Sequence, residues 1–64
     1  MSDLTTDQAT DLIDAALRRL IGHDDLMAAQ SAAPQALVHR RRIDDANRLR
    51  DMLTDGRAQV VIHD

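Results

Sequence analysis

The chain contains no cysteine and none of the three large aromatic residues, Phe, Trp and Tyr. Without cysteine, it can form neither a disulfide nor a thiolate metal site. Because aromatic side chains supply the largest single buried areas in protein cores, any core must consist of Leu, Ile, Val, Met and Ala. A single domain of this small size rarely stabilises itself by more than about 3–5 kcal/mol without a staple or a partner. The composition therefore favours oligomerisation.

Lysine and glutamate are also absent, so that all 8 basic residues are Arg and all 11 acidic residues are Asp. The net charge of −3 argues against a chain built mainly to coat nucleic acid. No apolar run approaches the roughly 18 residues that a membrane-spanning helix needs, and the N-terminus has no targeting pattern. We expect a cytoplasmic protein with no membrane contact.

Two segments show helical periodicity, over about residues 5–30 and about residues 34–55, with a turn at 31–33. Thr5 followed three residues later by Gln8 is a capping box, which predicts the first helix start. Gly56 predicts the end of the second helix. Helices of similar length joined by a short turn lie antiparallel. We therefore predict a single all-α domain over residues 1–64, an antiparallel two-helix hairpin.

A short β-strand is expected after the second helix, over about residues 58–62. Val60, Val61 and Ile62 are consecutive β-branched residues, which suit a strand and disfavour a helix. No other segment reads as a strand, so the partner strand is expected in another chain. The alternative is a tail that folds back on the hairpin.

A polar layer is expected where the two helical stripes face each other. With the turn centred near Ala32, facing residue numbers add up to about 63. This register sets His23 and Asp24 against His39, one turn from Arg42. Two histidines and a carboxylate could hold a metal ion, but a neighbouring arginine repels a cation, and structural sites usually have four ligands. We favour a structural ion cluster and expect no metal and no cofactor.

The arginines at 40–42, 48 and 50 form the one basic cluster. Arg40, Arg41, Arg48 and Arg50 are candidate phosphate contacts on one helix. Asp44 and Asp45 lie one turn away, so that i,i+4 pairing is expected to neutralise much of this charge. The lack of aromatics also removes base stacking. Nucleic-acid binding is therefore the alternative function, that of a small regulatory or antitoxin-like protein.

The chain offers no arrangement of residues for catalysis. The adjacent pairs Asp24-Asp25 and Asp44-Asp45 point about 100° apart on a helix and do not converge. No serine or threonine has a histidine and an orienting group around it. We expect a protein that is not an enzyme.

The first helix carries an apolar stripe that is too broad for one partner helix to cover. A second hairpin or a larger assembly would cover the remainder. The expected function is a protein–protein interaction or assembly module: a homo-oligomer, or a small structural or adaptor subunit of a larger complex, including virion-type assemblies. The expected interaction residues come from this stripe and from the tail, namely Leu12, Ile13, Leu17, Leu20, Ile21, Val60, Val61 and Ile62.

Overall fold

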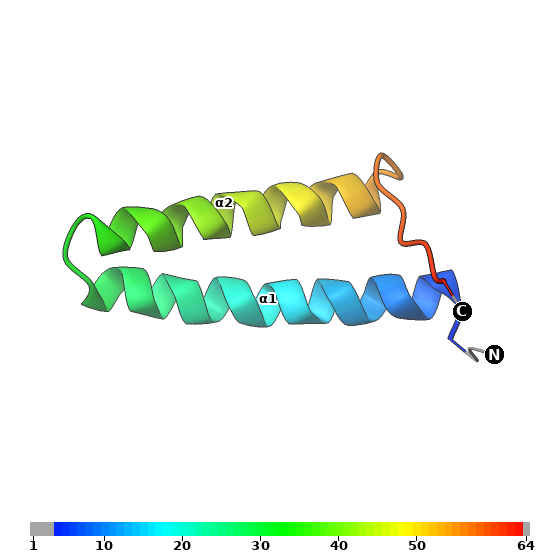
Figure 1. Cartoon of the computed structure of the whole chain (residues 1–64), viewed down its shortest axis with the longest axis horizontal. Helices are drawn as coiled ribbons and strands as arrows, with labels where there is room; N and C mark the ends of the chain where they lie inside the picture. Colours follow the sequence, from blue (N-terminus) through cyan, green and yellow to red (C-terminus); the bar gives the residue numbers. More distant parts are fainter. Residues whose placement is uncertain (1–3, 64) are drawn as a thin grey trace.

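The computed structural model describes residues 4–63, which form two α-helices and no strand. Helix α1 spans Thr6–Gln30 and α2 spans Gln35–Thr54. The helices lie side by side and antiparallel, joined by a short turn, and the described segments before α1 and after α2 lie at the opposite, open end (Figure 1). The prediction of an all-α helical hairpin is confirmed.

The ends of the helices follow local sequence signals. Thr5 and Gln8 form the complete capping box, with each side chain bonded to the other residue's backbone N–H. At the end of α2, Gly56 adopts a φ of 77°. The backbone N–H groups of Gly56 and Arg57 donate to the carbonyls of Leu53 and Met52, which is the Schellman arrangement. Glycine tolerates this left-handed backbone without a Cβ clash.

The turn between the helices differs slightly from the prediction. The sequence predicts a turn at residues 31–33 and a second helix that begins at about residue 34. Pro34 itself is the N-cap residue, and no side chain caps this end of the helix. Helix α1 continues through Gly22 to Gln30. The loop therefore takes up only a few residues and brings the helices into register.

The core of the hairpin is thin. Among the described residues, the buried side chains are Ala9, Ala28, Ala46 and Asp24, so every large aliphatic residue keeps part of its surface in water. The cause is geometric, since one neighbouring helix covers only one side of a broad apolar stripe. The hydrophobic stabilisation of the hairpin, which scales with the apolar area removed from water, is correspondingly small.

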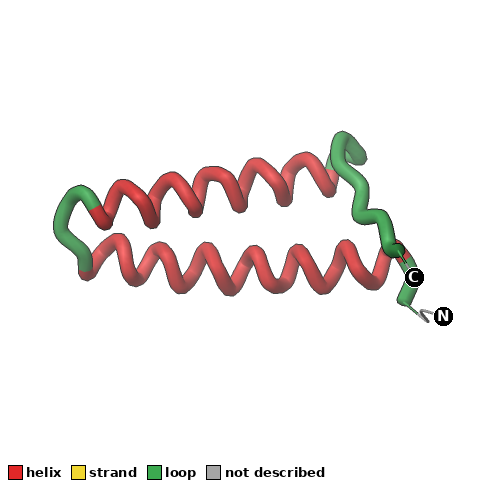
Figure 2. Tube along the Cα trace, viewed as in Figure 1, coloured by secondary structure: helices red, strands yellow, loops and turns green. Residues whose placement is uncertain are grey.

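The tail does not form the expected strand within this chain. The described residues 58–63 are irregular, because no second strand is present to supply ladder hydrogen bonds. Instead the tail crosses the open end of the hairpin from α2 toward the start of α1 (Figure 2). Val60 and Ile62 are half-buried, while Val61 is 66% exposed. The fold-back alternative thus describes the single chain.

Candidate interaction surface

The contact between the helices contains one buried charged side chain, Asp24, whose exposed fraction is 0%. Its Oδ1 lies 2.9 Å from Nδ1 of His39 and 3.7 Å from Nη1 of Arg42. Within the described part of the chain, Oδ2 of Asp24 has no hydrogen-bond partner. Because a buried carboxylate is costly unless it is paired, His39 is the group that makes this position tolerable. The structure brings Asp24, His39 and Arg42 together as the predicted register required.

His23 lies outside this cluster. Its side chain is exposed, and it makes no hydrogen bond or ion pair with any described residue. Position 23 is turned by about 100° from position 24 around the helix, so both cannot face α2. Across residues 4–63, no three His, Asp or Glu side chains are grouped so as to hold a metal ion.

A second ion cluster was not predicted from the sequence. Nε of Arg50 donates to Oδ1 of Asp14 at 2.8 Å, and Nε of Arg18 lies 3.2 Å from Oδ2 of the same carboxylate. The hydrogen bond from Arg50 and the attraction of both guanidinium groups lower the pKa of Asp14, against a smaller opposing effect of desolvation. Arg50 is therefore engaged within the hairpin, whereas it was expected to be a phosphate contact.

The other candidate phosphate contacts, Arg40, Arg41 and Arg48, are exposed on α2. The expected i,i+4 pairs with Asp44 and Asp45 are not formed among the described residues. Exposed ion pairs of this kind contribute little free energy, because holding two long side chains in one geometry costs entropy. These arginines and aspartates line an open surface depression together with Leu37 and Val38.

Large aliphatic side chains lie on the outside of the hairpin. The most exposed of them are Leu4, Leu12, Leu26, Leu37, Val38, Leu49 and Val61. Scattered exposed aliphatic residues are normal on protein surfaces, so their arrangement is what matters. Four of the helical ones fall into two regular rows.

Each helix carries a row with alternating spacings of four and three residues, which is the spacing of positions that face a partner helix. The outer stripe of α1 consists of Leu12, Ala16, Arg19, His23 and Leu26. The outer stripe of α2 consists of Val38, Arg42, Asp45, Leu49 and Met52. Except for Met52, which is half-buried, all of these residues are exposed. Both stripes are apolar at their ends and charged in the middle.

The two outer stripes lie on the same side of the hairpin. Asp14 and Arg50 bond along one edge of the contact between the helices. A helix turns by about 100° per residue. Leu49 precedes Arg50 by one residue and Leu12 precedes Asp14 by two, so both leucines lie along the other edge of the contact. Helix periodicity places both stripes there. We call the surface that they form together the outer face, and the opposite side carries the Asp14 cluster and further polar residues.

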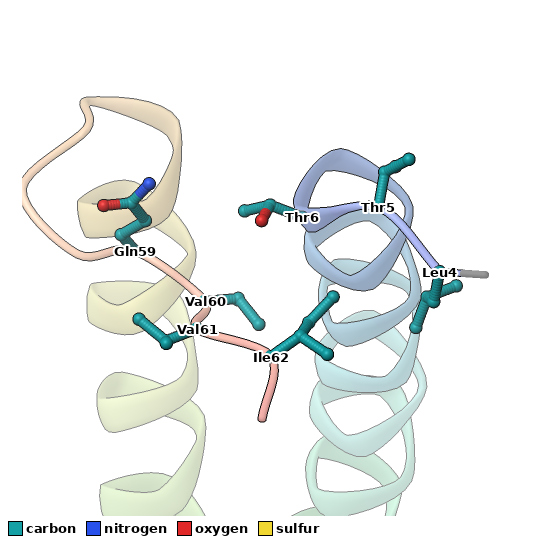
Figure 3. A pocket seen from close by; sticks show the side chains of 7 residues that line it. All are labelled: Leu4, Thr5, Thr6, Gln59, Val60, Val61 and Ile62. Atoms are coloured by element: carbon teal, nitrogen blue, oxygen red, sulfur yellow. The ribbon is translucent and has the colours of Figure 1, made fainter. Parts of the chain in front are cut away.

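The predicted interaction residues of α1 divide between two environments. Leu12 is exposed on the outer face, whereas Ile13, Leu17, Leu20 and Ile21 are half-buried toward α2. In the tail, Val60 and Ile62 point toward α1 and Val61 points away, beside the open hollow lined by Leu4–Thr6 and Gln59–Ile62 (Figure 3). The sequence interpretation did not include Leu26, Val38 and Leu49, although their spacing from Leu12 and Met52 could have identified them.

No family model, curated protein or solved structure matches this chain. In the described part of the chain, no helix is long and apolar enough to cross a membrane.

Proposed function

We propose that this chain is a non-enzymatic protein–protein interaction or assembly module. The supporting observation is the reversal of the usual burial pattern among the described residues: the buried side chains are alanines and one aspartate, while five leucines and two valines are exposed. Burial is worth roughly 25 cal/mol for each Å² of apolar surface removed from water. A partner that covers the exposed aliphatic residues of this hairpin would therefore contribute considerable hydrophobic stabilisation.

The tail supplies a second contact in this proposal. Residues 58–62 carry apolar side chains on both sides, as a strand buried on two faces does. In an assembly they pair with the same segment of another copy, or with a sheet edge of another protein by β-augmentation. The exposure of Val61 in the single chain is in keeping with this role.

The experiment is a measurement of mass in solution by native mass spectrometry, on the purified chain and on the chain isolated from its native source. An oligomer, or a complex with another protein, is the expected result. The chain acts either as a homo-oligomer or as a small structural or adaptor subunit, with virion-type assemblies included. A monomer in both samples would refute the interaction function.

A second candidate function is nucleic-acid association by a regulatory or antitoxin-like protein. The observation that favours it is the exposure of Arg40, Arg41 and Arg48 without the expected carboxylate pairing. Arg50 is removed from this set by its bond to Asp14. A net charge of −3 and the lack of aromatics weigh against tight binding.

A salt titration separates the two functions, because phosphate contacts give an affinity that falls steeply with salt. We expect little or no binding of DNA or RNA at about 0.15 M salt. A tight complex at that salt, lost in Arg40→Ala/Arg41→Ala, would replace the assembly function with the nucleic-acid function. Arg57→Ala is a matched control, since Arg57 pairs with Asp55 outside the cluster.

A further inference from the structure

We infer that the partner on the outer face is a second copy of this chain, placed so that α1 of each copy packs on α2 of the other. This inference rests on the proposed interaction function and identifies the partner. In this arrangement the two-fold axis runs parallel to the helices, so that each of the four pairs of neighbouring helices is antiparallel. The result is a four-helix bundle.

The first argument is that the two outer stripes match each other in height along the hairpin. Asp14 lies level with Arg50, and Asp24 lies level with His39. The same register sets Leu12 level with Met52 and Leu26 level with Val38. A two-fold axis parallel to the helices preserves height, so the partner's residue 12 lies opposite residue 52 and the partner's residue 26 lies opposite residue 38.

The second argument is complementarity of size in the apolar layers and of charge in the middle layer. From the open end to the turn, the layers pair Leu12 with Met52, Ala16 with Leu49, Arg19 with Asp45, His23 with Arg42 and Leu26 with Val38. The middle layer joins a cation to an anion, and symmetry provides that pair twice. Neither Arg19 nor Asp45 has an ion-pair partner among residues 4–63 of the single chain.

The third argument is that charge disfavours the alternative face-to-face arrangement. A two-fold axis perpendicular to the helices would stack α1 on the partner's α1 and α2 on the partner's α2. With the apolar ends of the stripes overlaid, that axis lies level with Arg19 and Asp45. It then sets Arg19 against Arg19 and Asp45 against Asp45, and like charges across an interface are unfavourable. If one copy in the favoured arrangement slid along the other by seven residues, Arg19 would lie opposite the apolar Val38 or Met52 instead of Asp45. Charge therefore selects both the arrangement and its register.

The size of the outer face suits a stable dimer. The hairpin measures 46 × 22 × 15 Å, and the helices lie side by side across the broad direction. A standard interface buries about 800 Å² on each partner, which the broad face of such a body can supply. The opposite broad face is occupied by the Asp14 cluster.

Matched leucine substitutions test whether the outer face forms the dimer. Leu12 and Leu37 are 62% and 61% exposed in the single chain, and only Leu12 belongs to an outer stripe. Leu12→Asp is expected to make the dimer dissociate at concentrations where Leu37→Asp remains dimeric, with helicity at high concentration checked by circular dichroism. Equal masses for the two variants would overturn the assignment of this face.

Charge reversal tests the pairing in the middle layer. Arg19→Asp or Asp45→Arg alone replaces two attractive pairs by two repulsive ones, so the dissociation constant should rise on the order of tenfold. The double variant Arg19→Asp/Asp45→Arg restores opposite charges and should recover most of that loss. Double-variant affinity no better than that of the single variants would overturn the pairing.

Cross-linking tests the arrangement itself, and the chain's lack of cysteine makes single-cysteine variants specific probes. A short bifunctional maleimide is added to a mixture of Leu26→Cys and Val38→Cys chains, and to a mixture of Leu12→Cys and Leu26→Cys chains. We expect cross-linked heterodimers in the first mixture. Predominant cross-linking in the second would overturn the arrangement in favour of the perpendicular axis.

The solution mass distinguishes failure of this inference from failure of the proposed function. A purified chain that is monomeric at high concentration, yet forms a complex with another protein in its native source, would overturn the dimer and leave the interaction function standing. A monomer in both samples would overturn both.

Discussion

The pair formed by Asp24 and His39 should be the most sensitive point of the hairpin. His39→Ala removes a hydrogen bond of 2.9 Å and leaves a carboxylate that has no solvent exposure. Deleting the partner of a buried carboxylate leaves an uncompensated charge, which typically costs about 3–5 kcal/mol. Arg42, 3.7 Å away and partly exposed, can move closer and recover a part. We expect a net loss of about 3 kcal/mol.

This loss is large compared with the whole stability of such a chain, which is about 3–5 kcal/mol for a single small domain. His39→Ala should therefore be substantially unfolded at low protein concentration. Replacing both residues by Leu should be close to neutral or stabilising, because it removes the buried carboxylate along with its partner. The effects of Asp24→Leu and His39→Leu should thus be non-additive by a margin of more than about 1 kcal/mol.

The assay is urea unfolding followed by far-ultraviolet circular dichroism. It is run at two protein concentrations, because oligomerisation makes the apparent stability concentration-dependent. The set is His39→Ala, His39→Leu, Asp24→Leu and Asp24→Leu/His39→Leu, with His63→Ala as the control, since His63 is exposed in the tail. A loss below about 0.5 kcal/mol for His39→Ala, the range of ordinary surface substitutions, would refute the account of the buried pair.

Two further outcomes are expected. The pKa of Asp14 is lowered mainly by its hydrogen bond from Arg50, so this carboxylate contributes stability above the ordinary aspartate pKa of about 3.9, and the contribution is lost as the pH falls through the folded value. When stability is titrated with acid, wild type and Asp14→Asn should therefore become equally stable at low pH. An Asp25→Asn control that converged with wild type in the same way would contradict this. Truncation after Arg57 should reduce the size of the native assembly while circular dichroism shows the helices retained, whereas lost helicity with unchanged assembly would assign the tail to the hairpin alone.

The sequence predicted the hairpin well because its determinants are local. The capping box at Thr5 and Gln8 and the glycine at position 56 mark helix ends by backbone chemistry that needs no tertiary information. The short turn then leaves little freedom in how the helices align. The contact of Asp24 with His39 follows from that alignment.

The less predictable features depend on long side chains and on groups outside the chain. Helical periodicity places Asp14 on the flank of its helix, and its bond to Arg50 forms only because the arginine side chain reaches across the contact. The i,i+4 pair of Arg41 with Asp45 was expected and does not form within residues 4–63, because water competes for exposed charges. The expected strand over residues 58–62 requires a partner strand, and no other described segment of the chain supplies one.

A charged layer interrupts the apolar contact within the hairpin and another interrupts the proposed contact between two hairpins, and that placement has a physical consequence. Layers of Ala, Leu and Val are tolerant of sliding, because small aliphatic side chains fit one another in several registers. A single polar layer penalises each wrong register by leaving a charge against an apolar side chain. Asp24 with His39 would fix the hairpin, and Arg19 with Asp45 would fix the dimer. The doubly substituted Asp24→Leu/His39→Leu chain should therefore keep or gain stability and lose uniqueness, visible as several oligomeric species in place of one.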